Sequence, residues 1–182
     1  MGQYSSPNVP FVEARATGKR HRPSVIALDP SFTSTEIGAA YALAVSMNGT
    51  GATTSYHYVV DSQQTYRCVP ESNSAYFNDD SKKMLGVLVC DDPKSTPGRW
   101  YEHTHEALLA EVADVVAQLC LIHDIRPRYL SEPELKKWQK WRSKRRGGIL
   151  LHDHMTKGSW PEDYFMRLVN AHIAKHKLVH NK

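Results

Sequence analysis

The chain has 182 residues, of which 41% are hydrophobic and 23% charged, and its formal net charge is +4. This composition is typical of one globular domain with a sizeable core, and it excludes disordered and fibrous proteins. No run approaches the ~20 apolar residues of a membrane-spanning helix, and no secretory signal is visible at the N-terminus. The pI of about 8.9 permits an anionic partner without naming one.

The cysteine content argues against a disulfide-stabilised scaffold. Cys68, Cys90 and Cys120 are too few and too scattered along the chain for such a framework. We therefore expect three buried thiols that pack as small apolar side chains.

The first third of the chain begins with a polar arm. Residues 1–22 contain two prolines and a basic GKRHR run, and they predict an extended arm that precedes a domain of residues 23–182. The apolar run SVIAL (24–28) predicts a buried strand. A helix is expected from Thr35 to Asn48, where Asn-Gly ends it, with Ile37, Tyr41 and Val45 forming its apolar stripe.

The middle third is rich in β-branched and aromatic residues. Residues 54–61 and 65–69 flank a short Ser-Gln-Gln turn and predict a hairpin. Residues 70–83 have the composition of a loop, and the apolar run 85–90 predicts another buried strand.

The last third alternates helical and extended patterns. A long helix is expected from about 102 to 124, with Leu108, Val112, Val115, Leu119 and Ile122 on one face. The basic segment 133–146 leads through Gly-Gly to a strand at 149–151. Pro161 is suited to open a last helix, whose apolar side holds Phe165, Leu168, Val169 and Ile173.

Five of these segments carry motifs of a known family in a shared order and spacing. They are VIALDPS (25–31), SYHYVVD (55–61), LGVLVCD (85–91), the helix from 102, and GGILLHDHM (147–155), which runs on to Trp160-Pro161. Together they resemble the type-2 N-acetylmuramoyl-L-alanine amidases of phages and bacteria. The resemblance implies a peptidoglycan-recognition-protein-like α/β fold, with helices flanking a single mixed β-sheet.

The resemblance also implies a zinc site. In this family two histidines and one cysteine or aspartate hold Zn²⁺, and the fourth position is left for water. The metal acidifies that water and polarises the carbonyl of the bond between N-acetylmuramic acid and L-alanine. The three ligand positions fall at Asp29, His152 and Trp160.

Only His152 keeps the family's side chain at its ligand position. Asp29 replaces a histidine; a carboxylate can bind zinc, and its other interpretation is a hydrogen bond to the turn that follows. Trp160 offers no ligand atom. Three neighbouring side chains could replace it: His154, Glu162 and Asp163.

Two further residues match family positions, and one family residue is missing. Tyr56 falls where some members hold a tyrosine that assists the transition state, although it could serve packing alone. Lys157 lies near a position where a lysine could stabilise an oxyanion, although it could also be a solvated loop residue. The family's groove glutamate is replaced within the apolar residues Val87, Leu88 and Val89.

A basic stretch follows the long helix. Seven of the eleven residues from 136 to 146 are Lys or Arg: Lys136, Lys137, Lys140, Arg142, Lys144, Arg145 and Arg146. Trp138 and Trp141 would share one face of a helix. Either the tryptophans dock this segment on the core, or the whole stretch, Trp138 and Trp141 included, binds a polyanion.

These observations favour one function over two others. The first hypothesis is an amidase-fold phage protein that has lost zinc-dependent catalysis and serves as a cell-wall-binding or structural, tail-associated component of the virion. The alternative is an active, endolysin-like zinc amidase that cleaves the MurNAc–L-Ala bond. The third is a nucleic-acid-binding module acting through residues 136–146, whose binding would weaken steeply with salt.

The first hypothesis sets the expected partners and location. The partner is peptidoglycan or an anionic cell-wall polymer, together with other virion proteins, whereas a membrane is excluded and nucleic acid is disfavoured. We expect no cofactor, and zinc only if the alternative holds. The chain would be made in the host cytoplasm without a signal peptide and would act in the virion or at the host cell wall.

Overall fold

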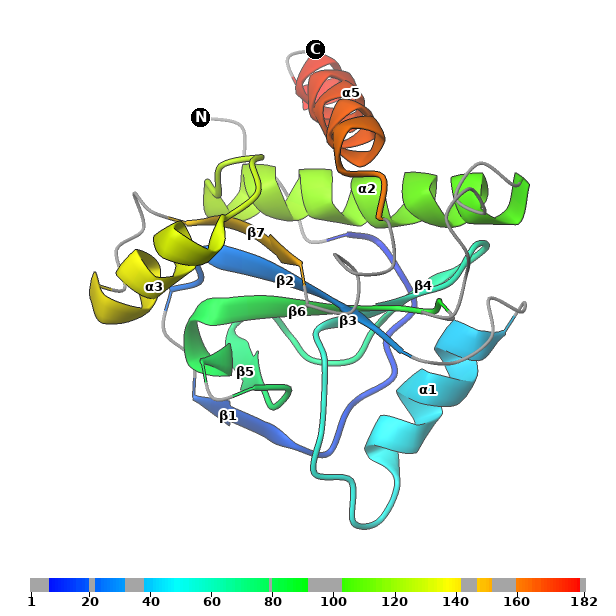
Figure 1. Cartoon of the computed structure of the whole chain (residues 1–182). Helices are drawn as coiled ribbons and strands as arrows, with labels where there is room; N and C mark the ends of the chain where they lie inside the picture. The colour runs from blue at the N-terminus through cyan, green and yellow to red at the C-terminus, as the bar shows by residue number, and fades with distance from the viewer. Residues whose placement is uncertain are drawn as a thin grey trace.

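The computed structural model describes residues 7–19, 22–31, 38–78, 80–91, 103–141, 147–151 and 160–180. A central β-sheet is covered on one face by α2 (His103–His123), and α5 (Glu162–His180) packs across α2 on its outer side (Figure 1). The helix α1 (Ala39–Asn48) covers the other face. The predicted α/β fold with helices on both sides of a mixed sheet is confirmed.

The central sheet has five strands in the order β4-β3-β6-β2-β7. They are β2 (Val25–Pro30), β3 (Tyr58–Val60), β4 (Thr65–Arg67), β6 (Met84–Val89) and β7 (Gly148–Leu151). The pair β3–β4 is the predicted hairpin and is antiparallel, whereas β3, β6, β2 and β7 run parallel. The parallel strands are nearly continuous apolar runs because the sheet is covered on both faces.

The alternation of side chains along β2 divides the core into two faces. Ile26 and Leu28 belong to the cluster under α2 and α5. Val25 and Ala27 point to the opposite face, where they pack against Trp138. Because successive residues of a strand alternate, Asp29 shares the face of Val25 and Ala27, the face that α1 covers further along.

The helix α1 differs from its prediction in orientation. It begins at Ala39, after Gly38 with φ +88°, whereas the predicted start at Thr35 and the predicted stripe residue Ile37 lie outside the described residues. Tyr41 and Val45, predicted to be buried, are 54% and 44% exposed. Three small or flexible side chains face the sheet instead: Ala40, Ala44 and Met47. The small alanine side chains let α1 pack closely on the sheet. The prediction missed them because it looked for large apolar residues at helical spacing.

The two long helices follow their predictions closely. Leu108, Val112, Val115 and Leu119 of α2 are buried, whereas Ile122 is only half-buried. Phe165 and Val169 of α5 are buried against the same cluster, and Pro161 directly precedes the helix. Among the described residues, no helix is long and apolar enough to cross a membrane.

The N-terminal segment and the predicted loop form a second, small sheet. Residues Thr17–Lys19 (β1) pair antiparallel with Asn73–Ala75 (β5), and a 3-10 turn follows at Ser81–Lys83. The prediction that residues 70–83 are only a loop is therefore wrong. Before β1 the chain is extended, and Val12 and Ala14 donate backbone hydrogen bonds to the carbonyls of Arg67 and Cys68.

The three cysteines are free and buried, as predicted. Burial raises the pKa of each thiol, Cys68, Cys90 and Cys120, to about 12. Each sulfur is therefore a neutral, unreactive part of the core at physiological pH.

Candidate functional site at the carboxyl end of the parallel strands

The carboxyl ends of the parallel strands form the edge where the candidate site lies. Asp29 is the penultimate residue of β2 and is buried. On the neighbouring strands Leu28 pairs with Leu151, the last residue of β7, and Asp29 pairs with Leu88 of β6. In open α/β sheets this edge is the usual place for a ligand.

Tyr56 meets Asp29 at this edge. Burial, the negative charge of Asp29 and the hydrogen bond between the two side chains together raise the pKa of Tyr56 far above its ordinary value. The phenol therefore stays protonated and donates its hydrogen to the carboxylate. Two residues that the sequence singled out separately are thus in direct contact.

An aromatic stack holds Tyr56 in place. Its ring stacks on Phe77 with ring centroids 5.1 Å apart and an interplanar angle of 24°. Phe77 in turn lies against Gly86, where an added Cβ would come within 2.6 Å of the Phe77 ring. The absence of a side chain at Gly86 therefore allows this stack to lie flat on β6.

His57, next to Tyr56, has a structural role. Its Nδ1 accepts a hydrogen bond from the Gly86 amide at 3.0 Å, so its Nε2 carries the proton and donates to the Asn73 carbonyl at 3.1 Å. The ring is fully buried. Both nitrogens are thereby used in joining β3, β5 and β6.

Asp61 ties the start of α1 to the hairpin turn. Its carboxylate is fully buried, and one oxygen accepts the Gly38 and Ala40 amides, both at 3.2 Å. The other oxygen accepts the amides of Gln63 and Gln64 at 2.9 and 2.7 Å. A negative charge at a helix N-terminus is favourable, so Asp61 serves as a remote cap for α1.

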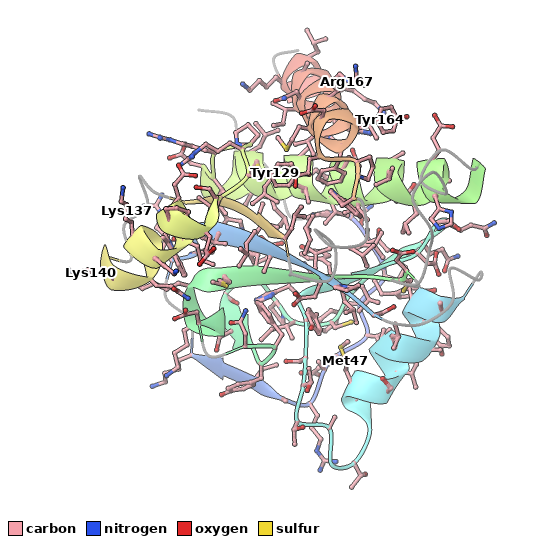
Figure 2. All side chains as sticks on the ribbon, viewed as in Figure 1. Met47, Tyr129, Lys137, Lys140, Tyr164 and Arg167 are labelled. Carbon is pink, nitrogen blue, oxygen red and sulfur yellow. The ribbon has the colours of Figure 1, made fainter. Side chains whose placement is uncertain are left out.

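Trp160, at the position predicted for the third ligand, is part of the core. It is 5% exposed, and its indole N–H donates to the hydroxyl of Tyr129 at 2.9 Å. Phe165 meets it edge-on with ring centroids 5.0 Å apart. Burial raises the pKa of Tyr129, whose position is marked in Figure 2, so its hydroxyl remains a neutral acceptor.

Two of the three residues that could replace Trp160 as a ligand lie in the described part of the chain. Glu162 and Asp163 are exposed in the first turn of α5, and their charges add to the raised pKa of Tyr129. Glu162 lines one surface hollow together with Tyr129 and Leu151. The predicted residues His152, His154 and Lys157 lie outside the described residues.

The site's neighbouring strand is apolar, as the sequence indicates. Val87, Leu88 and Val89 are at most 6% exposed. Leu88 stands beside Asp29 in register, so the described surroundings of this carboxylate include an apolar neighbour and the Tyr56 hydroxyl.

The basic stretch begins on α3 (Glu132–Trp141), and the polyanion site predicted for it stays a prediction. Lys136, Lys137 and Lys140 are exposed, and Lys137 and Lys140 point away from the sheet in Figure 2. Trp138 is fully buried, and its indole N–H donates to Ser24 Oγ at 2.9 Å. Trp138 therefore docks α3 on the core and cannot contact a polyanion. The Trp141 side chain and Arg142, Lys144, Arg145 and Arg146 lie outside the described residues.

The sequence analysis missed one cluster of ligand-type side chains. Asp114 of α2 lies beside His172 and His176 of α5. The available signal was the spacing of four between the two histidines within a predicted helix, which places both on one face.

These features define an α/β fold of the amidase class, and comparison with known structures identifies its relatives in shape. No family model matches the sequence, and no curated protein matches it. The catalytic domain of XlyA is similar with a TM-score of 0.61 at 16% identity, over 89% of this chain and 99% of that one. Staphylococcus aureus hydrolase AmiA, solved with its ligand, gives 0.62 at 12% identity, over 93% and 84%.

A third similar structure carries the activity in its description. It is the endolysin N-acetylmuramoyl-L-alanine amidase LysCS from Clostridium intestinale URNW, with a TM-score of 0.56 at 10% identity, over 92% of this chain and 98% of that one. The chain therefore has the fold of endolysin amidases, as its motifs predict.

Proposed function

We propose that this chain is an amidase-fold protein that binds peptidoglycan or an anionic cell-wall polymer without the family's zinc-dependent hydrolysis. The observation that supports it best is Trp160, which stands at a ligand position yet is buried and hydrogen-bonded to Tyr129. A protein that keeps the amidase fold but buries a predicted ligand position in its core is suited to binding and assembly. We assign it to a tail-associated part of a phage virion, by analogy of fold.

The described residues do not fit a catalytic zinc ion at the family's position. Such a site needs three deprotonated ligands that converge and leave one position open. Asp29 has its carboxylate hydrogen-bonded to Tyr56, and Trp160 has no ligand atom. The residue beside Asp29 on β6 is Leu88, which can supply none either.

The binding half of the proposal rests on the fold and on two kinds of surface. Asp29 and the Tyr56 phenol supply hydrogen-bonding groups at the strand edge where related folds hold their ligands. The exposed lysines of α3, Lys137 and Lys140, supply positive charge for an anionic polymer. The similar structures include an N-acetylmuramoyl-L-alanine amidase, whose substrate class guides the choice of ligand.

Two assays on the full chain test the two halves separately. The first is co-sedimentation with purified peptidoglycan, with and without its anionic polymers, and we expect the chain in the pellet. The second measures free L-alanine amino termini released from the same peptidoglycan with added Zn²⁺, and we expect none above a heat-inactivated control. Release of peptides would overturn the loss of catalysis, and a chain that stays in the supernatant would overturn the binding role.

One observation favours the alternative, an active zinc amidase. Glu162 lines a hollow with Leu151, the residue that directly precedes His152, so a carboxylate is available near the end of β7. Asp29, His152 and Glu162 would then be the ligands, with Asp163 or His154 as substitutes for Glu162 and with Tyr56 and Lys157 assisting. On this alternative His152→Ala abolishes amide hydrolysis and Glu162→Gln weakens it strongly. Hydrolysis that survives His152→Ala would refute it.

A further inference from the structure

Three ligand-type side chains converge where α5 crosses α2. The Nδ1 atom of His172 and the Nε2 atom of His176 each lie 2.8 Å from the same carboxylate oxygen, Oδ1 of Asp114. All three candidate ligand atoms lie within 4.8 Å of one another. The side chains are 21 to 32% exposed, so the cluster is partly buried but open to solvent.

The packing of the two helices sets this convergence. Phe165 and Val169 anchor α5 in the core, and His172 and His176 continue the same side of the helix toward its end. The crossing of α5 over α2 is visible in Figure 1. The cluster therefore rests on two packed helices rather than on a loop.

The Asp114 carboxylate is held in orientation from its other side. Gln118, one turn further along α2, donates a hydrogen bond to Oδ2 of Asp114 at 2.7 Å. Oδ1 is thereby directed at the two imidazoles. An outer hydrogen bond of this kind is what orients carboxylates that bind metals.

A second carboxylate lies close by. Burial and the charge of Asp114 raise the pKa of Glu111, and the nearby His172 lowers it. Glu111 lies one turn before Asp114 on α2, so two carboxylates and two imidazoles share one corner of the molecule.

The position of His172 in this cluster is not explained by hydrogen bonding. Its Nδ1 is shielded from solvent and makes no hydrogen bond with satisfactory geometry, although Asp114 Oδ1 lies only 2.8 Å away. The contact is within ion-pair distance, and an imidazole nitrogen and a carboxylate oxygen that face each other in this way can also share a divalent ion. His176 does form a hydrogen bond with the same oxygen.

We propose that Asp114, His172 and His176 bind a divalent transition-metal ion such as Zn²⁺, with water completing the coordination. Two imidazoles and a carboxylate are ligands that suit Zn²⁺ and its neighbours in the first transition row. Around a tetrahedral ion with bonds of about 2.0–2.2 Å, ligand atoms lie about 3.3 Å apart. The two separations of 2.8 Å widen to that value through small side-chain rotations. The ion would join α5 to α2.

The test is zinc affinity of the full chain, stripped of metal by a chelator and titrated with Zn²⁺ by calorimetry. The informative variant is His176→Gln, because glutamine can still donate a hydrogen bond to Asp114 but is a poor zinc ligand. Asp114→Asn is the second variant, and Lys175→Ala, an exposed neighbour on α5, is the matched control. His152→Ala serves to separate this site from the family's zinc position.

We expect about one Zn²⁺ per chain at the cluster, with affinity unchanged in Lys175→Ala. His176→Gln and Asp114→Asn should each weaken binding by about a hundredfold or more, and Gln118→Ala by about tenfold to a hundredfold. Co²⁺ bound to the chain should show the visible absorption of nitrogen ligation, and His176→Gln should lose it. Zinc binding that is absent in the native chain, or that survives both His176→Gln and Asp114→Asn, would overturn the proposal. Metal-free melting curves confirm that each variant folds.

Discussion

Replacing Trp138 by alanine tests how the basic helix α3 is attached. The Trp138 side chain is fully buried against Val25, Ala27 and Met84, and its N–H is bonded to Ser24 Oγ. Loss of a buried tryptophan costs about 3–5 kcal/mol of unfolding free energy. In a domain of this size that lowers the melting midpoint by about 6–20 °C.

The assay is thermal and urea unfolding followed by circular dichroism, with Lys137→Ala as the matched control on the same helix. Lys137 is exposed, so its loss should change the free energy of unfolding by about 0.5 kcal/mol or less. Trp138→Phe keeps an aromatic ring in the site but loses the hydrogen bond, for about 1 kcal/mol, and some packing, so its cost should lie between those of Lys137→Ala and Trp138→Ala. Ser24→Ala removes the same bond, so the double variant should cost less than the sum of the two single changes. If Trp138→Ala unfolds at the same midpoint as Lys137→Ala, the docking argument is refuted.

Three further predictions follow from buried or clustered groups. Asp61→Ala removes the acceptor of four backbone amides and should cost about 3 kcal/mol, measured by urea unfolding, with Asp61→Asn closer to the native value. Cys68, Cys90 and Cys120 have their thiol pKa raised to about 12, so iodoacetamide at pH 8 should label them only after denaturation. Because unfolded thiols ionise near pH ~8.5, their contribution to stability is complete below that pH and is lost as pH rises toward 12. Zn²⁺ at about a hundred times its dissociation constant should add about 2.7 kcal/mol to the unfolding free energy, and His176→Gln should remove this gain.

The fold was predictable where local pattern and burial agree. The central strands β2 and β6 are short apolar runs, and they are buried on both faces. The stripe of α2 is spaced for one buried face and is buried along most of its length. The helix α1 was misjudged because its alanines, not Tyr41 and Val45, approach the sheet. The small alanine side chains allow α1 to lie close to the sheet, and this decides its orientation. A pattern of hydrophobic residues carries no information about how closely a helix approaches a sheet.

The sequence singles out Asp29 and Tyr56 separately but does not predict their contact. Asp29 lies near the carboxyl end of β2, whereas Tyr56 precedes β3, and β6 lies between these two strands. Their hydrogen bond therefore depends on the stack of Tyr56 on Phe77 above Gly86, which motif order does not predict. The two possible roles of Trp138, docking and polyanion contact, were both open in the sequence. Only its burial decides between them, since residues far apart in the chain surround it.

If the family's zinc site has been lost as proposed, the residues Asp29 and Trp160 support that loss together. A zinc ligand must be polar and must face the open edge of the sheet. Trp160 instead packs its apolar ring in the core and donates its indole N–H to the Tyr129 hydroxyl. Burying a large apolar side chain stabilises a fold by about 1.5–3 kcal/mol, a gain that a small ligand at this position would forfeit. Asp29, meanwhile, accepts a hydrogen bond from the Tyr56 phenol, which partly satisfies its charge. On the proposed function, replacing Trp160 by a ligand would not create the family's site by itself, because the Asp29 carboxylate would also have to exchange the phenol for the metal.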